Sequence, residues 1–298
     1  MSANLHYDTV SLLKITFKFK LMDLGFSELG KKSEYKTQYD ASLLFPIPRS
    51  IKRDELGIKG VPEFKGVDIW TGFEVSWLNM KGKPQVRIAV FEIDALSQCL
   101  IESKSFKLYL NSFNNTHFAS DDEVTKIMQH DLSQAANGVV SVTLYALKDY
   151  PCHVTNQFVA ESIDELDIEI NEYMTNPQFL SADQTSKVHE RLSSDLLKSN
   201  CLVTFQPDWG SVLIEYQGGK INREGLLKYL VSFRDHNEFH EQCVERIYTD
   251  IMLYCQPEKL CVYARYTRRG GLDINPMRAN FMFDAEQNEQ KQIRLARQ

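Results

Sequence analysis

A cysteine and an aspartate seven residues apart form the pattern in this chain best suited to covalent chemistry. Cys201 and Asp208 belong to the segment CLVTFQPDWG, in which we expect a strand to open at Cys201 and a turn to form around Pro207. Such a turn can fold the two side chains toward each other. The thiolate is the nucleophilic form of cysteine and its ordinary pKa is about 8.5, so a catalytic thiol needs a neighbour that takes its proton. The alternative for any single cysteine is a small buried apolar side chain.

A second candidate pair, His240 and Glu241, stands where a helix should begin. Asn237 could cap that helix. A histidine in the first helical turn lies at the positive end of the helix dipole, which disfavours its charged form. We therefore expect His240 to act as a neutral hydrogen-bonding group, the alternative being a surface histidine beside an N-terminal glutamate.

Two further polar segments could bind ligands. The segment IESKSFK, residues 101–107, opens an expected helix and is too rich in polar side chains for a helix cap alone. The segment RYTRRGG, residues 265–271, is a basic cluster ending in glycines, which suits a phosphate held by charge and backbone amides. The alternative for the second segment is an ordinary basic loop.

Some familiar signatures are missing. No GxGxxG segment follows an expected strand and no GxxxxGK[ST] segment occurs, so a dinucleotide would not be held by the doubly wound nucleotide fold or by a phosphate loop. Cys152 and His153 are adjacent, but no second pair at metal-ligand spacing accompanies them. We expect no metal site.

The elements that must position these residues occur twice along the chain. With a shift of 120 residues, residues 109–113 match residues 229–233 at four of five positions, and residues 124 and 127 match residues 244 and 247. A shift of 118 residues pairs residues 145 and 146 with residues 263 and 264. This order of matches indicates a duplicated unit.

Each copy carries the same sequence of periodicities. Apolar residues alternate at 73–77 and 212–216, the period of a half-buried strand, and we matched these two segments to each other. Helical spacing follows from Phe106 and from Leu226, then a second helix around 124–127 or 244–247, the first with Ser120 and Glu123 placed as a capping box. Strands at 140–146 and 261–266 close the copies. The pattern predicts an α+β unit with an antiparallel sheet, present twice.

Composition limits the partners. A net charge of -6 argues against a protein that binds nucleic acid through its phosphates. A small molecule or another protein is the expected partner. No apolar run approaches the roughly 20 residues that span a bilayer, and six dispersed cysteines fit reduced thiols, so we expect a cytoplasmic protein. The expected divisions are an N-terminal extension (1–45), a first half (46–160), an acidic connector (161–195) and a second half (196–298).

Four segments, taken in their order along the chain, resemble the long form of the QueF nitrile reductases. They are residues 102–107, residues 201–208, the His240–Glu241 pair and residues 265–271. The resemblance runs from about residue 39 to residue 280. It implies a tandem tunnelling fold of two ββααββ-like halves with helices on one face, the architecture of GTP cyclohydrolase I. It also implies a homodimer without a required metal, which uses NADPH to reduce 7-cyano-7-deazaguanine to the aminomethyl base on the route to queuosine.

The resemblance also implies roles for individual residues. Cys201 would form a covalent thioimide with the nitrile carbon, and Asp208 would supply or relay the proton. The substrate-binding residues would be Ile101, Glu102, Ser103, His240 and Glu241. The residues at the cofactor would be Ser103, Lys104, Arg269 and Gly270.

Three alternatives remain open on the sequence. A cysteine hydrolase or amidotransferase would use Cys201, His240 and Asp208 as nucleophile, base and orienting acid. A zinc-dependent cyclohydrolase could be built on the same fold. A ligand-binding scaffold without catalysis would retain the repeat for assembly only.

Overall fold

The computed structural model describes residues 36–151, 156–291 and 293–298. The Cys152–His153 pair and most of the expected N-terminal extension therefore lie outside the described residues. Residues 39–44 of that extension pack on the first half, where Tyr39 stacks edge-on against Phe113 and donates a hydrogen bond to Asp131.

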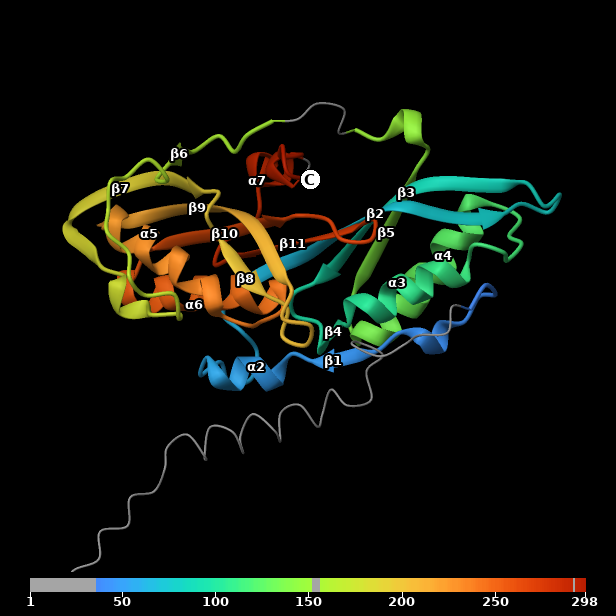
Figure 1. Ribbon diagram of the computed structural model, residues 1–298, viewed down its shortest axis with the longest axis horizontal. Helices are drawn as coiled ribbons and strands as arrows, with labels where there is room; N and C mark the ends of the chain where they lie inside the picture. Colours follow the sequence, from blue (N-terminus) through green and yellow to red (C-terminus); the bar gives the residue numbers. More distant parts are fainter. Residues whose placement is uncertain (1–35, 152–155, 292) are drawn as a thin grey trace, which may run out of the picture.

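One long sheet runs through the described chain, and four helices cover one of its faces (Figure 1). The strand order is β5-β3-β2-β11-β10-β9-β7-β6, with β8 beside β9. The strands are β2 (Lys65–Leu78), β3 (Pro84–Asp94), β5 (Val140–Tyr145), β6 (Glu161–Ser162), β7 (Ala182–Ser194), β8 (Lys198–Asn200), β9 (Pro207–Ile221), β10 (Lys259–Tyr266) and β11 (Leu272–Ala279). All pairings are antiparallel except β6 with β7. The predicted α+β class with an antiparallel sheet is confirmed.

The covering helices are α3 (Ser103–Ser112), α4 (Asp121–Ala136), α5 (Arg223–Val231) and α6 (His240–Cys255). The short helix α7 (Ala285–Gln290) lies on the opposite face (Figure 1). The remaining elements are β1 (Pro46–Pro48), which pairs with β4 (Cys99–Ile101), helix α2 (Ser50–Glu55), and the 3₁₀ turns η1 (Ala41–Leu43), η2 (Leu147–Asp149), η3 (Pro177–Phe179) and η4 (Ser232–Asp235). No helix in the described ranges is long and apolar enough to cross a bilayer.

The duplication predicted from the sequence is visible in the topology. Each half is a hairpin, two helices and a strand: β2, β3, α3, α4 and β5, then β7, β9, α5, α6 and β10. β11 pairs with β10 on one side and β2 on the other, and so joins the halves into one sheet. Tyr109 bonds Asp131 at 2.7 Å in one half, and Tyr229 bonds Asp250 at 2.6 Å in the other.

Two expectations about strands need correction. Residues 73–77 were expected to correspond to residues 212–216, but by topology β9 corresponds to β3 and β2 corresponds to β7. Residues 182–194, assigned to the acidic connector, form β7, which pairs with β9 in the sheet. β7 carries mostly polar side chains and has only two buried residues, Leu192 and Ser194, so it lacks the apolar signal of a strand buried on both faces.

Helix starts follow the capping expectations in part. Ser120 caps α4 as predicted, accepting from the amide of Glu123, whose carboxylate accepts from the amide of Ala119. Asn237 does not cap α6: the helix begins at His240, and the cap position is Phe239. Asn237 instead forms a β-bridge with Asn200, which holds it outside the helix.

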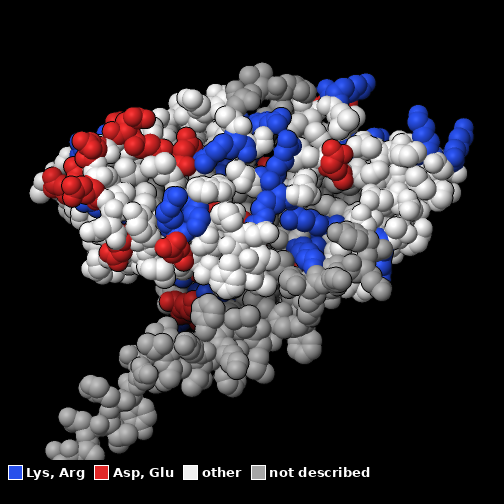
Figure 2. Space-filling view, in the orientation of Figure 1, with Lys and Arg blue, Asp and Glu red and all other residues white. Residues whose placement is uncertain are grey.

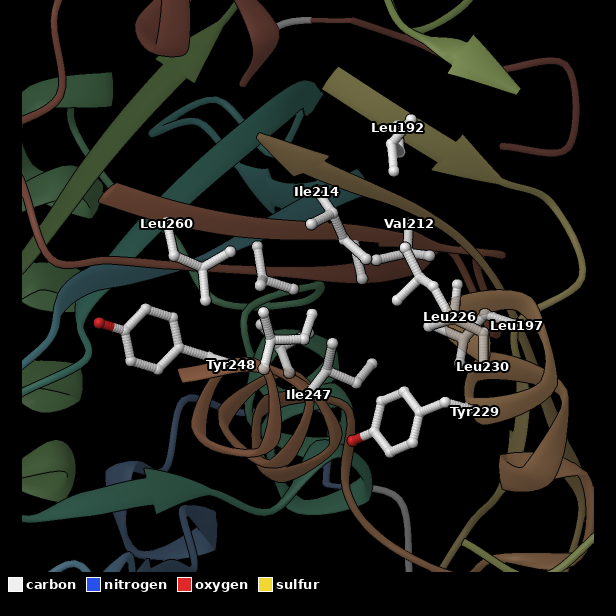
Figure 3. Close-up of a cluster of buried hydrophobic side chains, with 14 of the residues drawn as sticks. Leu192, Leu197, Val212, Ile214, Leu226, Tyr229, Leu230, Ile247, Tyr248 and Leu260 are labelled. Atoms are coloured by element: carbon white, nitrogen blue, oxygen red, sulfur yellow. The ribbon is translucent and has the colours of Figure 1, made fainter. Parts of the chain in front are cut away.

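Apolar side chains fill the space between the sheet and the helices in both halves. Figure 3 shows the second-half cluster, where Val212 and Ile214 of β9 point toward Ile247 of α6. A smaller cluster that includes Leu213 and Tyr263 lies on the other face of the sheet. β9 is therefore buried along both faces, which explains its nearly continuous apolar sequence.

A buried ion cluster links the two halves. Asp68 from β2 contacts Arg49 at 2.5 Å and Arg278 at 2.7 Å. Glu245 from α6 contacts Arg53 at 2.7 Å and Arg278 at 2.9 Å. All five side chains are buried, so each charge depends on its partners rather than on water.

Candidate active site

A cavity of about 320 Å³ lies where the N-termini of α3 and α6 meet over the sheet. The predicted site residues that line it are Ile101, Ser103, Lys104, Cys201, Asp208, His240, Glu241 and Arg269. Glu102 and Gly270 are not among the lining residues, although both adjoin residues that are. The structure thus brings together side chains from residue 101 to residue 269 in one place.

A short closed loop carries the thiol. Cys201 follows β8 directly, and its amide donates to the carbonyl of Gln206 at 2.9 Å, while its carbonyl accepts from Phe205 at 3.0 Å. Phe205 has a φ of 57°, a conformation that a bulky residue rarely adopts. The expected strand at Cys201 is therefore wrong, because β9 begins at Pro207. The loop nonetheless brings Cys201 and Asp208 to the same cavity, as the turn was expected to do.

Asp208 is 4% exposed and has two cationic or hydrogen-bonding neighbours. Arg269 Nη1 lies 2.5 Å from its Oδ1, and His240 Nε2 lies 3.4 Å from the same oxygen. Burial by itself raises the pKa of Asp208, but the hydrogen bonds with His240 and Arg269 and the positive charge of Arg269 outweigh burial and lower that pKa. Asp208 is thus an ionised carboxylate, ready to accept a proton.

His240 is fixed by stacking. Its ring lies parallel to Tyr266, with centroids 3.9 Å apart and an interplanar angle of 6°. As predicted, it occupies the first turn of α6. Its Nδ1 is buried and has no hydrogen-bond partner within the described part of the chain. That nitrogen remains available to a ligand.

Glu241 lies beside His240 with 3% of its surface exposed. Burial, and then repulsion from Asp68, raises the pKa of its carboxyl to about 7, against a weaker opposing effect of His240 and Arg49. A carboxyl in this range can exchange its proton near neutral pH. It lines the cavity as a group that can accept hydrogen bonds from a ligand once ionised.

Glu102 is fully buried and caps α3. Its two carboxylate oxygens accept from the amides of Lys104 and Ser105, each at 2.7 Å. Burial raises the pKa of Glu102, whereas these two hydrogen bonds lower it by a smaller amount. Glu102 therefore sets the geometry of the helix start that presents Ser103 and Lys104 to the cavity.

The wall beside Arg269 contains Lys107, the last residue of the candidate segment 101–107, for which no individual role was expected. Lys107 lies one turn after Ser103 on α3 and lines the cavity. Its ammonium makes no ion pair among the residues that the structure describes, and burial, followed by repulsion from Arg269, lowers its pKa. Its side chain also packs near Gly270, which has a φ of 60°. The spacing of residues 103 and 107 on one helical face was a signal that could have identified it.

Other lining residues were also missed. They include Trp70, Thr204, Gln206, Phe239 and Thr267. Phe239 directly precedes His240, so adjacency could have suggested it, whereas nothing in the pattern around Trp70 distinguishes it from a core residue. Among the described residues, no group of three histidine, cysteine or acidic side chains is arranged to hold a metal ion.

Cations gather at this site. Lys104, Lys107 and Arg269 all line the cavity. Figure 2 shows Lys and Arg side chains toward the middle of the molecular face, whereas acidic side chains gather at the end that carries β7. A small molecule with phosphate groups would find its complement at the cationic part of the surface.

An α+β protein whose cavity combines a thiol, an ionised carboxylate, a second buried carboxyl and several cations has the side chains that a thiol-dependent enzyme acting on small molecules requires. Two domain families match the chain: residues 35–144 match the N-terminal domain of nitrile reductase, 7-cyano-7-deazaguanine-reductase, and residues 207–282 match the QueF-like proteins. The chain belongs to the QueF family of nitrile reductases.

Close relatives are known in several bacteria. The chain is 61% identical to the NADPH-dependent 7-cyano-7-deazaguanine reductase of Cupriavidus necator over 259 residues, 86% of this chain and 93% of the relative. It is 58% identical to the enzyme of the same name from Hydrogenovibrio crunogenus over 257 residues, 86% of this chain and 92% of that one. A crystal structure of the archaeosine synthase QueF-Like in the apo form matches with a TM-score of 0.29 and 18% identity, covering 33% of this chain and 97% of that one.

Proposed function

We infer that this protein catalyses the NADPH-dependent reduction of the nitrile of 7-cyano-7-deazaguanine to the aminomethyl group, a reaction of queuosine biosynthesis. Identity near 60% to reductases of that name, over more than nine-tenths of their length, supports the activity. The observation that carries it in the structure is the meeting of Cys201 and Asp208 in one cavity. Cys201, 9% exposed, is a thiol at the wall of a site that contains an ionised carboxylate.

The chain's own residues supply the covalent step. Asp208 accepts the thiol proton of Cys201, directly or through water, and the sulfur attacks the nitrile carbon. A carbon–sulfur bond forms, one carbon–nitrogen π bond breaks, and Asp208 passes the proton to the nitrogen, giving a thioimide. Arg269 and His240 hold Asp208 in place during this exchange. The thioimide is a better hydride acceptor than the nitrile.

The chemistry that NADPH supplies is hydride transfer, once to the thioimide carbon and once to the imine that remains when the sulfur departs. Three cationic side chains suit the phosphate groups of NADPH, because Lys104, Lys107 and Arg269 line the cavity together. Lys107, with no ion pair in the described ranges, is suited to a phosphate oxygen. Ser103 and Gly270 stay in our proposal as neighbours of the cofactor.

The remaining site roles follow the same proposal. Glu241, with Ile101, Ser103 and His240, surrounds the base, and Glu241 accepts from its N–H groups. Glu102 is proposed to accept hydrogen bonds from the base as well, although its oxygens also cap α3. The base would then be held by both halves at once.

We further propose that the two halves are tandem tunnelling folds that assemble as a homodimer in the cytoplasm. Each half contains a hairpin, a pair of helices and a further strand in the same order, which supports the tandem fold. We place the two halves at 46–160 and 196–298; β7, inside the connector at 161–195, pairs with β9 of the second half.

The test is intact mass after mixing the protein with 7-cyano-7-deazaguanine in the absence of NADPH. Wild-type protein should gain the mass of one base, and Cys201→Ala should gain none, while Cys261→Ala, on the other sheet face, should still form the adduct. With NADPH added, absorbance of the reduced cofactor should fall only for proteins that carry Cys201. A hydrolase would turn over without consuming NADPH, and a passive scaffold would form no adduct, so either result would refute the proposal.

A further inference from the structure

The indole of Trp70 is an unusual part of the cavity wall. Trp70 lies on β2, paired with Phe91 of β3 and Ile274 of β11, and it packs edge-on against Phe106 with centroids 5.0 Å apart. Its surface is fully buried, yet it lines the cavity beside Ile274. Strand pairing and the edge-on contact fix the ring in one position.

The Nε1–H of Trp70 is a buried donor without a hydrogen-bond partner in the described part of the chain. Buried indole N–H groups are almost always paired, because an unpaired donor gives up its hydration without replacement. Trp77, a buried tryptophan on the same strand, has no such unpaired atom. An unpaired donor at a cavity wall, in a ring held by its neighbours, indicates that a ligand or water completes it.

The chemistry of the site specifies what kind of atom Trp70 can meet. An indole N–H donates and cannot accept, so its partner must be an acceptor. Glu241 is suited to the N–H donors of the base, which leaves the ring carbonyl oxygen at position 6 in need of a donor. The other lining residues with unpaired buried atoms, Thr204 and His240, come from the same half as Cys201, whereas Trp70 comes from the opposite half. The 6-oxygen and the nitrile are carried by ring carbons that share one neighbour, so a base whose nitrile carbon is bonded to Cys201 keeps its 6-oxygen inside the cavity that Trp70 also lines.

We propose that the Trp70 Nε1–H donates a hydrogen bond to the 6-carbonyl oxygen of the deazaguanine, which makes Trp70 a specificity-determining residue. The inference rests on the proposed function, since it assumes that the base occupies this cavity. Trp70 binds the base and does not touch the reacting carbon. A donor at this position favours 6-oxo bases over analogues without the oxygen, because only a 6-oxo base completes the buried N–H.

Trp70→Phe tests the donor while keeping an aromatic ring, and Trp77→Phe is the matched control on the same strand. The equilibrium dissociation constant of 7-cyano-7-deazaguanine should rise roughly 5- to 30-fold in Trp70→Phe, the loss expected for one buried hydrogen bond. That of 2-amino-7-cyano-7-deazapurine, which lacks the 6-oxygen, should change less than about twofold. In turnover the KM should rise with little change in kcat. The control should bind both bases as wild type does.

A second measurement does not depend on the folding of Trp70→Phe. The chain has three tryptophans, so the wild-type protein gives three indole N–H resonances, and Trp77→Phe and Trp209→Phe assign two of them. The third, from Trp70, should move downfield when the cyano base is added and much less with the analogue.

The possible outcomes separate the two proposals. Wild-type protein that binds no base overturns both the function and the role of Trp70. Wild-type binding with equal losses for the two bases in Trp70→Phe, or a Trp70 resonance that the 6-oxo base leaves unmoved, overturns the role of Trp70 alone.

Discussion

Asp208 is the carboxylate that, in the proposed reaction, takes the proton from the thiol and passes it to the nitrile nitrogen. Two neighbours hold it, Arg269 at 2.5 Å and His240 at 3.4 Å, and together they lower its pKa although it is buried. An ionised Asp208 first takes a proton from the thiol and only then has one to give. The residue therefore works as a relay and not as a permanently protonated acid.

Asp208→Asn should slow adduct formation by about 10²- to 10⁴-fold, the range lost with a positioned proton carrier. The amide retains a similar shape but cannot take the proton, so the dissociation constant of the base should change only a few-fold. Rapid-mixing mass measurements give the rate, and calorimetry gives the affinity. Asp183→Asn, at an exposed carboxyl on β7, should change neither. A variant that lost binding while retaining the rate of adduct formation would contradict the relay role.

Glu241 makes the stability of the fold depend on pH. Its pKa is about 7 in the folded protein and about 4.5 in the unfolded chain, because burial favours the neutral carboxyl. The folded state thus binds the proton more tightly, and this contribution to stability is complete below about pH 4.5 and is lost as the pH rises through 7.

Between pH 5 and pH 8 the contribution of Glu241 to the free energy of unfolding should fall by about 2–3 kcal/mol. Glu241→Gln cannot ionise, so the wild-type curve should fall relative to the variant by that amount. Urea unfolding of both proteins at the two pH values measures the difference. Parallel curves for the two proteins would show that Glu241 does not titrate in this range.

At the scale of elements, two helix starts build the site. α3 and α6 begin at Ser103 and His240, and their first turns face the same cavity. Glu102 shapes the start of α3, while the start of α6 has Phe239 at the cap position, which lines the cavity instead of making a polar cap. Each start differs from its counterpart in the other half, where Asn222 caps α5 and Ser120 caps α4, so the two halves can contribute different groups to the site.

Glu102→Ala should lower the free energy of unfolding by about 1–2 kcal/mol, since two amides of α3 lose their acceptor. Asn222→Ala is the matched control, because Asn222 caps α5 through the amide of Gly225. It should cost a similar amount of stability. Only Glu102→Ala should also weaken binding of the cyano base, as measured by calorimetry. Equal binding in the two variants would limit Glu102 to the capping role.

At the scale of the whole molecule, buried charges tie the halves together beneath the cavity. Arg278 of β11 contacts Asp68 and Glu245, which come from different halves. Asp68 also contributes to the raised pKa of Glu241. The cluster is thus part of the electrostatic environment of the site as well as of the junction.

Glu245→Ala should lower the free energy of unfolding by about 3–5 kcal/mol, because the buried guanidinium groups lose their partner. Glu258→Ala removes an ion pair with Lys187 in which both side chains are largely exposed, and it should cost less than about 1 kcal/mol. Denaturant unfolding of the two variants against wild type gives both values. A small loss in Glu245→Ala would mean that the cluster does not hold the halves together.

Particular residues show how far the sequence could be interpreted. The periodicity from Phe106 and Leu226 predicted α3 and α5 because an amphipathic helix repeats every 3.6 residues whatever surrounds it. β7 was not predicted because a strand with mostly polar side chains, bordered on one side by only the two-residue β6, resembles a loop in sequence. The position of Phe239 at the cap of α6 was also not predicted. It depends on the bridge between Asn237 and Asn200, which lie far apart in the chain.

The sequence by itself determined the duplicated α+β unit, the family, and eight of the seventeen residues that line the cavity, since local periodicity and residue types are written along the chain. Only the tertiary structure decided that Asp208 is ionised, that the pKa of Glu241 is raised to about 7, and that the Nε1–H of Trp70 lacks a hydrogen-bond partner among the described residues. Each of these properties depends on which groups, far apart in the sequence, surround the buried side chain in the folded protein, because burial and charge act through space.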